Sequence, residues 1–269
     1  MNKKITNAIL IYKTLAVNSF NQRYAYMSGV WIQILGGVLF VFMQGSLWRT
    51  LIQTGYAQVT LKEMMSFVVI NAFVGYATNF RVTSIISDRV RDGMIAMDLI
   101  LPVGLKGKLF FENIGANLFD LAFSGIPGLF TGALLCGVVI PVGNFNLVFF
   151  SITVLLGVAI SYHMIYLFGL SAFWLINPWY IPILVGGLTK LFGGSVIPLW
   201  FYPHWLLSLC AILPFRFISY EPIQIYLGRY GANQAMNCVL MQILWLVIFM
   251  VTEKLVWLKA NKKIFVQGG

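Results

Sequence analysis

Three ionisable side chains lie within otherwise apolar stretches of the sequence: Glu112, Asp120 and Lys190. A charged group costs free energy in lipid and usually faces a bundle interior, a charged partner or a wet pathway. These residues are therefore the candidates for lining a transport pathway. A structural role is the alternative, because Glu112 lies one helical turn from Lys108, and Lys190 could snorkel to an interface or pair across helices.

The sequence lacks the residue patterns of common hydrolytic enzymes. His163 and His204 are far apart, and neither lies in an HExxH motif or beside an acidic cluster, so no metal site is predicted. No GxSxG nucleophile motif occurs. The glycine and lysine run at 104–108 lacks the spacing and the terminal hydroxyl residue of a GxxxxGK[ST] nucleotide loop. We therefore expect no catalytic residue, no metal and no cofactor in this chain.

The composition predicts that lipid surrounds most of the chain. Of 269 residues, 59% are hydrophobic and 10% are charged, against about 45–50% and about 25% in soluble domains. A crossing takes about 20 apolar residues, which leaves room for about six crossings and no separate soluble domain. The net charge of +10 could suit nucleic acid, but the basic residues lie beside apolar stretches, where they orient a membrane protein instead. Residues 1–269 are predicted to form one all-α membrane domain that binds no nucleic acid.

Six apolar stretches predict six transmembrane helices. They lie at about 28–48, 63–80, 112–138, 147–175, 181–197 and 235–257. Of the 18 basic residues, four precede Ser28, five lie between Arg81 and Lys108, and four follow Glu253. By the positive-inside rule these segments, and with them both termini, are expected on the cytoplasmic side.

Two further segments are expected to border the membrane. In residues 1–27, apolar residues recur at spacings of three and four between polar ones, which predicts an amphipathic helix in the cytoplasmic interface. Residues 198–231 are apolar and aromatic but contain four of the nine prolines, so we expect a re-entrant helical hairpin that dips into the outer leaflet and is shielded by protein. The residues that we single out as candidates in this hairpin are Pro198, Trp200, Pro203, Pro214 and Glu221.

The polar segment at 81–108 carries a family resemblance. It reads as a short interfacial helix followed by a break at Pro102-Val103-Gly104. Residues 86–103, ISDRVRDGMIAMDLILPV, combine arginines, a small helix with a glycine, and a leucine-rich run that ends in proline. In this segment, and in the order of elements over essentially the whole chain, the sequence resembles the ABC-2 type exporter permeases, particularly the branch related to antibiotic and drug efflux permeases.

The resemblance implies a permease subunit in a bacterial cytoplasmic membrane. Such a subunit pairs with a second permease, identical or homologous, and with two cytoplasmic ATPase subunits that bind ATP and Mg. The polar segment would then couple the permease to the ATPases through Asp88, Arg89, Arg91, Asp92 and Gly93. Exposed charges of both signs on a short helix suit such docking, although a solvated loop that only sets the topology is the alternative.

Two other functions stay open. A secondary transporter driven by an ion gradient would need a midplane carboxylate, for which Asp120 is the best candidate. A membrane-embedded lipid-modifying enzyme would need clustered polar residues at one interface, and Arg216, Glu221 and Arg229 come nearest to that. An ATP-driven exporter fits the sequence best, and whether its cargo is a drug, peptide, lipid or glycan is not settled by the residues.

Overall fold

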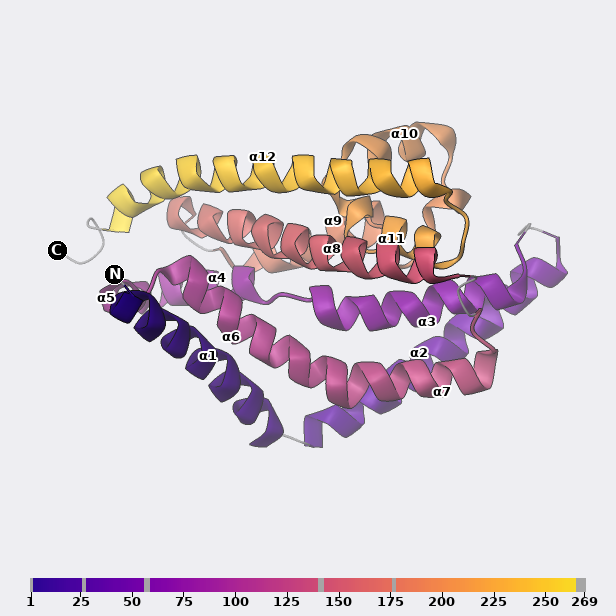
Figure 1. Cartoon of the computed structure of the whole chain (residues 1–269), viewed down its shortest axis with the longest axis horizontal. Helices are drawn as coiled ribbons and strands as arrows, with labels where there is room; N and C mark the ends of the chain where they lie inside the picture. The colour runs from indigo at the N-terminus through magenta and orange to yellow at the C-terminus, as the bar shows by residue number, and fades with distance from the viewer. Residues whose placement is uncertain (1, 26–27, 56–58, 140–142, 176–177, 265–269) are drawn as a thin grey trace.

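Every described element of the chain is a helix. The computed structural model describes residues 2–25, 28–55, 59–139, 143–175 and 178–264, and no strand occurs among them, which confirms the predicted all-α fold. The α-helices are α1 (Asn2–Ala25), α2 (Ser28–Gln53), α3 (Leu61–Thr78), α4 (Val82–Arg91), α5 (Ile95–Ile100), α6 (Leu105–Asp120), α7 (Ile126–Cys136), α8 (Asn144–Leu170), α9 (Ile181–Phe192), α10 (His204–Ile212), α11 (Tyr220–Tyr226) and α12 (Ala232–Ile264). Figure 1 shows that α4, α5, the start of α1 and the end of α12 lie at the same end of the molecule.

Within the described residues, four helical stretches are long and apolar enough to cross a membrane. They are Gly29–Gln53, Leu105–Cys136, Asn144–Trp174 and Ala232–Lys262, which correspond to the first, third, fourth and sixth predicted spans. The other two are shorter: α3 has 18 residues and α9 has 12, or about 27 and about 18 Å at 1.5 Å per residue, against about 30 Å of hydrocarbon. That α3 and α9 also cross the bilayer stays a prediction.

The helix of the fifth predicted span is interrupted. The span was placed at 181–197 with a helix weakened or interrupted by its glycines, and α9 ends at Phe192, followed by Gly193 and Gly194. Gly194 has a φ of +66°, a left-handed conformation that ends an α-helix and that glycine adopts without strain. The two glycines therefore turn the chain within the predicted span.

The third predicted span is one rod with a change of helical type in its middle. A π-helical turn at Leu121–Gly125 joins α6 to α7, and the N–H of Ile126 donates to the carbonyl of Leu121, five residues earlier. Pro127 follows directly, and proline has no N–H for the carbonyl of Phe123. The wider turn lets the rod continue past this missing hydrogen bond.

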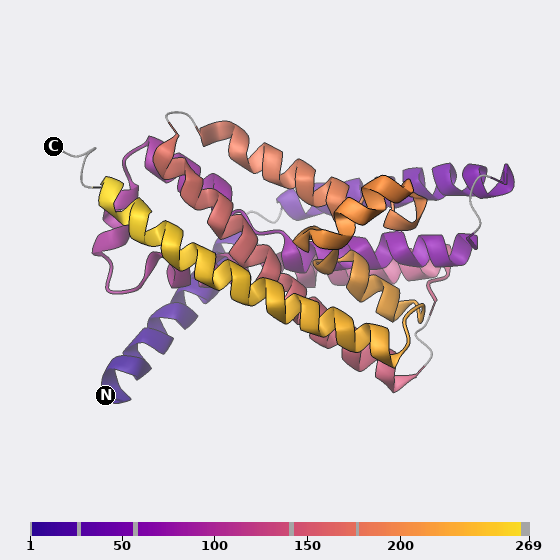
Figure 2. The same cartoon turned by 90° about the horizontal axis from the view of Figure 1, so that it is seen from above.

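The N-terminal helix packs along this rod rather than standing alone. Figure 1 shows α1 and α6 side by side, and Figure 2 shows the start of α1 extending away from the other helices. Tyr12 stacks on Phe111, with ring centroids 4.8 Å apart. Further along, a Cβ at Gly115 would collide with the backbone of Ala16, so the two helices touch backbone to backbone. The predicted helix at residues 1–27 is present over 2–25, and its place at the interface stays a prediction.

The central helix of the bundle is α8, which contacts α4, α11 and α12. A Cβ at Gly157 would lie 2.6 Å from the carbonyl oxygen of Ile218, so glycine permits close approach of the outer segment. One turn later, the buried hydroxyl of Ser161 donates to the carbonyl of Thr78 at 2.7 Å, at the end of α3. These small residues let the outer segment and the end of α3 both approach α8 closely.

The proline-rich segment at 198–231 folds into four short helical pieces, at the end of the molecule opposite the chain ends (Figure 1). Two of them, α10 and α11, alternate with the 3₁₀ turns Leu199–Phe201 and Pro214–Phe217. Pro198 and Pro203 precede a piece and Pro214 opens one, positions where a proline costs no helical hydrogen bond. The helical pieces agree with the predicted hairpin, and its depth in the outer leaflet stays a prediction.

A buried glutamine ties this segment to the long helices. The side-chain amide of Gln242, on α12, donates to the carbonyls of Thr153 and Phe217, each at 2.8 Å. Nearby, the guanidinium of Arg216 pairs with the buried carboxylate of Glu221, with Nε 2.5 Å from Oε1. The two bonds of Gln242 thus tie the 3₁₀ turn at Phe217 to α8 and α12, and the Arg216–Glu221 pair keeps both charges compensated.

The α1–α6 contact predicts a large effect for Gly115→Ala. The added methyl group would force α1 away from α6, and overpacking of this kind costs about 1–3 kcal/mol. We expect a lower thermal unfolding temperature in detergent and faster proteolysis of α1. Gly36→Ala, on α2, is the matched control, since a Cβ there meets no atom within 4 Å; equal effects of the two substitutions would contradict the observed contact.

Candidate functional site

The polar segment between the second and third predicted spans is firmly attached to the bundle. One face of α4, with Val82, Thr83 and Ile86, is buried. The hydroxyl of Thr83 donates to the carbonyl of Ile165 on α8 at 2.7 Å. The side chain of Ile86 lies against Gly169, where a Cβ would come within 2.9 Å. Thus α4 is a part of the bundle and not a helix that only floats at the interface.

Asp98 is the residue that ties α5 to its neighbours. Its side chain is buried, and its carboxylate pairs with Arg89 of α4 and with Lys108 of α6, whose Nζ lies 2.5 Å from Oδ1. Burial alone would raise the pKa of this carboxyl, but the hydrogen bonds and charges of Arg89 and Lys108 outweigh it and hold the pKa below its usual value. One carboxylate therefore links three helices.

The predicted coupling residues divide into an exposed group and one internal residue. Asp88, Arg91 and Asp92 are exposed, and Arg91 pairs with both acids at 3.3 and 3.1 Å. Gly93 makes the turn into α5 with a φ of +70°. Arg89, in contrast, points inward to Asp98. The structure thus brings all five residues together at one corner, with four of them at the surface.

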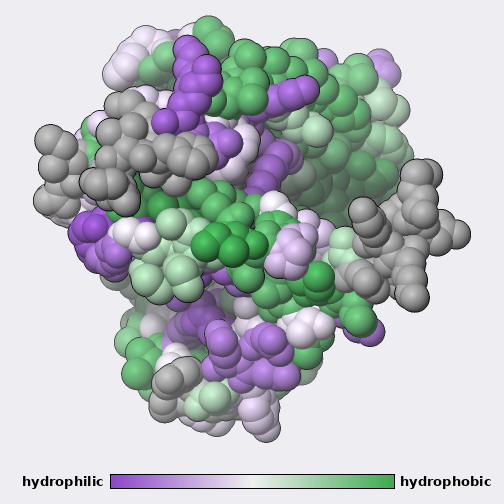
Figure 3. Space-filling view, turned by 90° about the vertical axis from the view of Figure 1, so that its left-hand side faces the viewer, coloured by the Kyte–Doolittle hydropathy of each residue, from purple (hydrophilic) through white to green (hydrophobic). Residues whose placement is uncertain are grey.

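Exposed apolar side chains continue this corner along α5. Met97 is 63% exposed and Ile100 is 79% exposed, and Met94 and Leu101 are exposed as well. We call the exposed residues Asp88, Arg91, Asp92, Met94, Met97 and Ile100 the α4–α5 surface. Figure 3, which views this end of the molecule, shows hydrophilic and hydrophobic residues intermixed. An apolar patch rimmed by charges is typical of a protein–protein contact.

A large polar hollow lies between α3 and α9, beside α2 and the start of α4. We call it the polar hollow; its volume is about 670 Å³. Its polar lining residues are Asn71, Tyr76, Thr78, Asn79, Arg81, Thr83, Ser84, Ser161, Thr189, Lys190, Ser195 and Ser219. Of the three predicted pathway residues, Lys190 is the one that lines it.

The other two predicted pathway residues lie elsewhere, beside cations. Glu112 is 3.8 Å from Nζ of Lys108, next to the Asp98 cluster. Asp120 pairs with Arg23 of α1 at 3.4 Å. These partners fit the structural role that was the alternative for Glu112, and a pathway role for either carboxylate stays a prediction.

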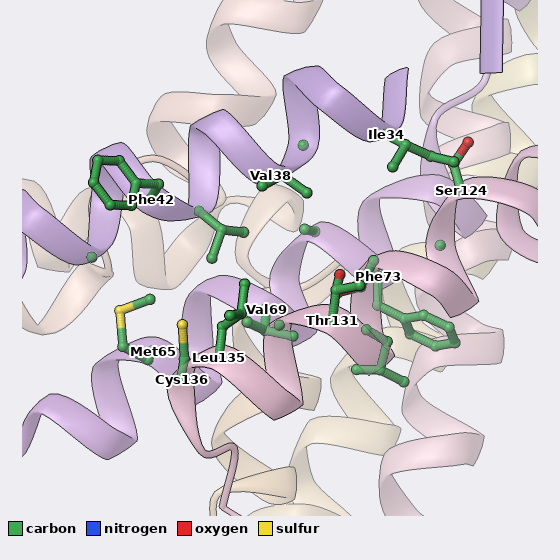
Figure 4. Close-up of a pocket in the computed structure, with 18 of the residues that line it drawn as sticks. Ile34, Val38, Phe42, Met65, Val69, Phe73, Ser124, Thr131, Leu135 and Cys136 are labelled. Atoms are coloured by element: carbon green, nitrogen blue, oxygen red, sulfur yellow. The ribbon is translucent and has the colours of Figure 1, made fainter. Parts of the chain in front are cut away.

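A second, apolar cavity borders the polar hollow. This apolar pocket, of about 400 Å³, lies between α2, α3 and α7, and Figure 4 shows side chains from all three helices around it. Gly37, Ala72 and Tyr76 line both spaces. The two cavities are therefore neighbours that share one wall.

A polar cluster around the buried carboxylate of Glu253 joins α12 to α6 and α8. The carboxylate of Glu253 lies 2.5 Å from Nζ of Lys106 and 2.9 Å from Nδ1 of His163. His163 is thus a partner of a carboxylate across two helices, whereas His204 lies exposed at the start of α10. Across the described parts of the chain, no group of three or more histidine, cysteine or acidic residues could hold a metal ion.

Comparison with protein families decides the assignment. The family model described as "ABC-2 family transporter protein" matches residues 40–268. The chain belongs to the ABC-2 transporter family. The predicted resemblance is thereby confirmed, and the match covers the α4–α5 surface, most of the polar hollow and the outer segment. No curated protein matches the sequence.

Membership in the ABC-2 family supports a transport subunit of the membrane, and sequence reasoning missed two parts of it. The first is Asp98, whose role was hidden because its partners Arg89 and Lys108 lie nine and ten residues away. A lone acid among apolar residues, with basic residues on both sides, was the available signal. The second is the polar hollow, whose walls come from segments far apart in the sequence, and no pattern signals it.

The linkage through Asp98 predicts that Asp98→Asn loosens this corner of the ABC-2 protein. Loss of the carboxylate leaves Lys108 buried without its main partner, which we expect to cost about 2 kcal/mol of unfolding free energy. Because the pKa of Asp98 is depressed, its contribution is present at neutral pH and is lost as the pH falls through that pKa. Thermal unfolding in detergent and proteolysis of the 92–104 segment would measure the change. Asp92→Asn removes an exposed acid from the same segment, and a loss as large in that variant would refute the assignment.

Proposed function

We propose that this chain is the membrane-spanning permease subunit of an ATP-driven exporter, which works with two cytoplasmic ATPase subunits and a second permease. The observation that carries the proposal is the α4–α5 surface, an exposed patch of apolar and charged residues at the end of the molecule that also holds the start of α1 and the end of α12 (Figure 1). A family permease has no ATP site in its own sequence, so it needs such a contact to receive energy. ATP and Mg would be bound by the partner subunits.

The contacts of α4 support transmission from that surface to the polar hollow. The helix packs against α8 and α9, and its first residues, Arg81 and Thr83, line the hollow. The Asp98 cluster joins α5 and α6 to the same unit. A push on the α4–α5 surface would therefore move one wall of the hollow as a rigid element.

The exposed face of α2 supports a second permease as a partner. Trp31, Ile32, Leu35, Leu39 and Phe42 are all exposed on this helix, and α2 is the least buried of the four long membrane helices. Because α2 also borders both cavities, a second permease against this face would enclose them from that side. The remaining apolar surface would face lipid.

The alternative functions have less support in the geometry. A proton-coupled secondary transporter would need Asp120 free in a pathway, and this residue pairs with Arg23. A lipid-modifying enzyme would need reactive polar groups in an open site, but Arg216 pairs with Glu221, and Arg229 lies 4.2 Å above the ring of Trp200 and 3.7 Å from Glu63.

Location in a bacterial cytoplasmic membrane, with both termini cytoplasmic, belongs to the same proposal. The start of α1 and the end of α12 lie at one end of the molecule (Figure 1), as an even number of crossings requires. The basic segments of the sequence gather at that end, in agreement with the positive-inside rule.

Purification of the tagged chain from its native membrane in mild detergent tests the proposed assembly. We expect mass spectrometry to find a stoichiometric subunit with a GxxxxGK[ST] nucleotide loop, together with a second six-span chain if the permease pair is a heterodimer. A chain that purifies alone under these conditions, including after chemical cross-linking in the membrane, would contradict the exporter assignment and favour a secondary transporter.

The docking role of the α4–α5 surface predicts that Arg91→Glu and Ile100→Glu each reduce ATPase association at least about tenfold, because each places an unfavourable charge in the contact. The amount of ATPase that co-purifies per permease is the measurement. Lys259→Glu makes the same charge change at an exposed site on α12 and should leave association unchanged. Normal assembly and transport in both surface variants would rule out this docking site.

A further inference from the structure

The wall of the polar hollow carries two cations: Arg81 lies within electrostatic range of Asp120, whereas Lys190 has no described counter-charge. Arg81 and Lys190 line it, and none of its lining residues is aspartate or glutamate. Among the described residues, the ammonium group of Lys190 has no ion pair and no hydrogen bond. The other polar groups of the wall are neutral amides and hydroxyls. An anion is therefore the occupant that this wall favours.

Lys190 lies far from the cytoplasmic end of its helix. It is nine residues beyond the start of α9 at Ile181, or about 14 Å along the axis, which is nearly half of the roughly 30 Å hydrocarbon thickness. The turn before α9, Pro178–Tyr180, contacts α4 at the cytoplasmic end. With α9 as the predicted fifth span, Lys190, which is exposed at the wall of the hollow, lies within the hydrocarbon region, where a lysine without a partner is costly. An acidic group of the transported molecule would supply one.

The neighbouring apolar pocket has the shape and lining for a hydrocarbon chain. Its wall on α2 runs from Ile34 to Arg49, about 22 Å along the helix. Figure 4 shows Val38, Val69 and Leu135 around the space, each on a different helix. Apart from Arg49 at its far end, no charged residue lines it. The pocket adjoins the polar hollow at Gly37, Ala72 and Tyr76, so one molecule can occupy both.

We infer that the polar hollow and the apolar pocket together bind an anionic amphiphile, with its acidic head beside Lys190 and Arg81 and its single hydrocarbon chain between α2, α3 and α7. That this molecule is the cargo rests on the proposed exporter function. Binding of this molecule does not depend on the exporter function, because it needs only the permease. The positive charge of Lys190 favours a negatively charged head group. Burial of the ligand's hydrocarbon chain in the apolar pocket contributes affinity.

The test uses the full chain, purified in the oligomeric state in which it occurs and placed in phosphatidylcholine nanodiscs. The probe is dodecyl phosphate with a photoreactive diazirine at the end of its chain, and cross-linked residues are mapped by mass spectrometry. We expect cross-links to the pocket walls on α2, α3 and α7. Unlabelled dodecyl phosphate should compete at least about tenfold better than dodecyltrimethylammonium, which has the same chain and the opposite charge.

Substitutions separate the two halves of the site. Lys190→Gln should weaken cross-linking about tenfold, whereas Lys190→Arg should retain it, since the charge is kept. Gly128→Leu should abolish pocket cross-links: Gly128 lines the apolar pocket and a Cβ there meets no atom within 4 Å, so the new side chain occupies the space without distorting the helix. Gly187→Leu adds the same bulk to α9 outside both cavities, where a Cβ likewise meets no atom within 4 Å, and is the control.

Several results would overturn the inference. Cross-links spread evenly over the lipid-facing helices, equal competition by the cationic amphiphile, or full cross-linking in Lys190→Gln would each do so. Loss of binding in Arg49→Gln but not in Lys190→Gln would place the head at the other end and contradict the orientation. None of these results depends on ATPase subunits, so failure of the exporter assembly and failure of this site are distinguishable.

Discussion

The structure depends on satisfying, inside the bundle, most of the polar groups that lipid cannot hydrate. Helices do this for their own backbone, but this chain breaks its helices repeatedly near α8 and must supply side chains at those breaks. Ser161 and Thr83 meet carbonyls between helices, and Gln242 reaches two at once. The bonds of Gln242 to Phe217 and Thr153 hold the short helical pieces at 198–231 against α8 and α12, in an environment that otherwise favours long, regular helices.

Buried charged side chains are likewise paired inside the bundle at the end of the molecule opposite the 198–231 segment. Asp98 and Glu253 are both buried; Asp98 pairs with Arg89 and Lys108, and Glu253 contacts Lys106 and His163. Breaking a buried pair is costly because one charge is left without compensation. The corner made of α4, α5 and the start of α6 is therefore a stiff unit, whereas the polar hollow contains Lys190, whose ammonium group has no ion-pair partner among the described residues. The stiff, charge-paired corner and the hollow with an unpaired lysine therefore lie at different places in the molecule.

Composition and hydrophobic runs were enough to predict the helical fold and the four long membrane helices, because burial in lipid imposes the same requirement on every residue of a span. The segment at 86–103 was enough for the family. Packing between helices could not be predicted from the sequence. The contact of Gly115 with Ala16 joins residues almost a hundred positions apart, and neither is unusual in its own helix. The early end of α9 at Phe192 had a signal in its glycines, but their backbone conformation decides whether a helix stops.

The π-helical turn at Leu121–Gly125 also sets the rotational phase of the rod that contains it. An α-helix advances about 100° per residue, so the additional residue in this turn rotates α7 relative to α6 by about that angle. Gly115 then faces α1 while Gly132 faces Val69 of α3. The number of residues between these glycines is consequently as constrained as their identity: a single deletion there would preserve the hydrophobicity of the span and still turn one of its two interfaces toward lipid.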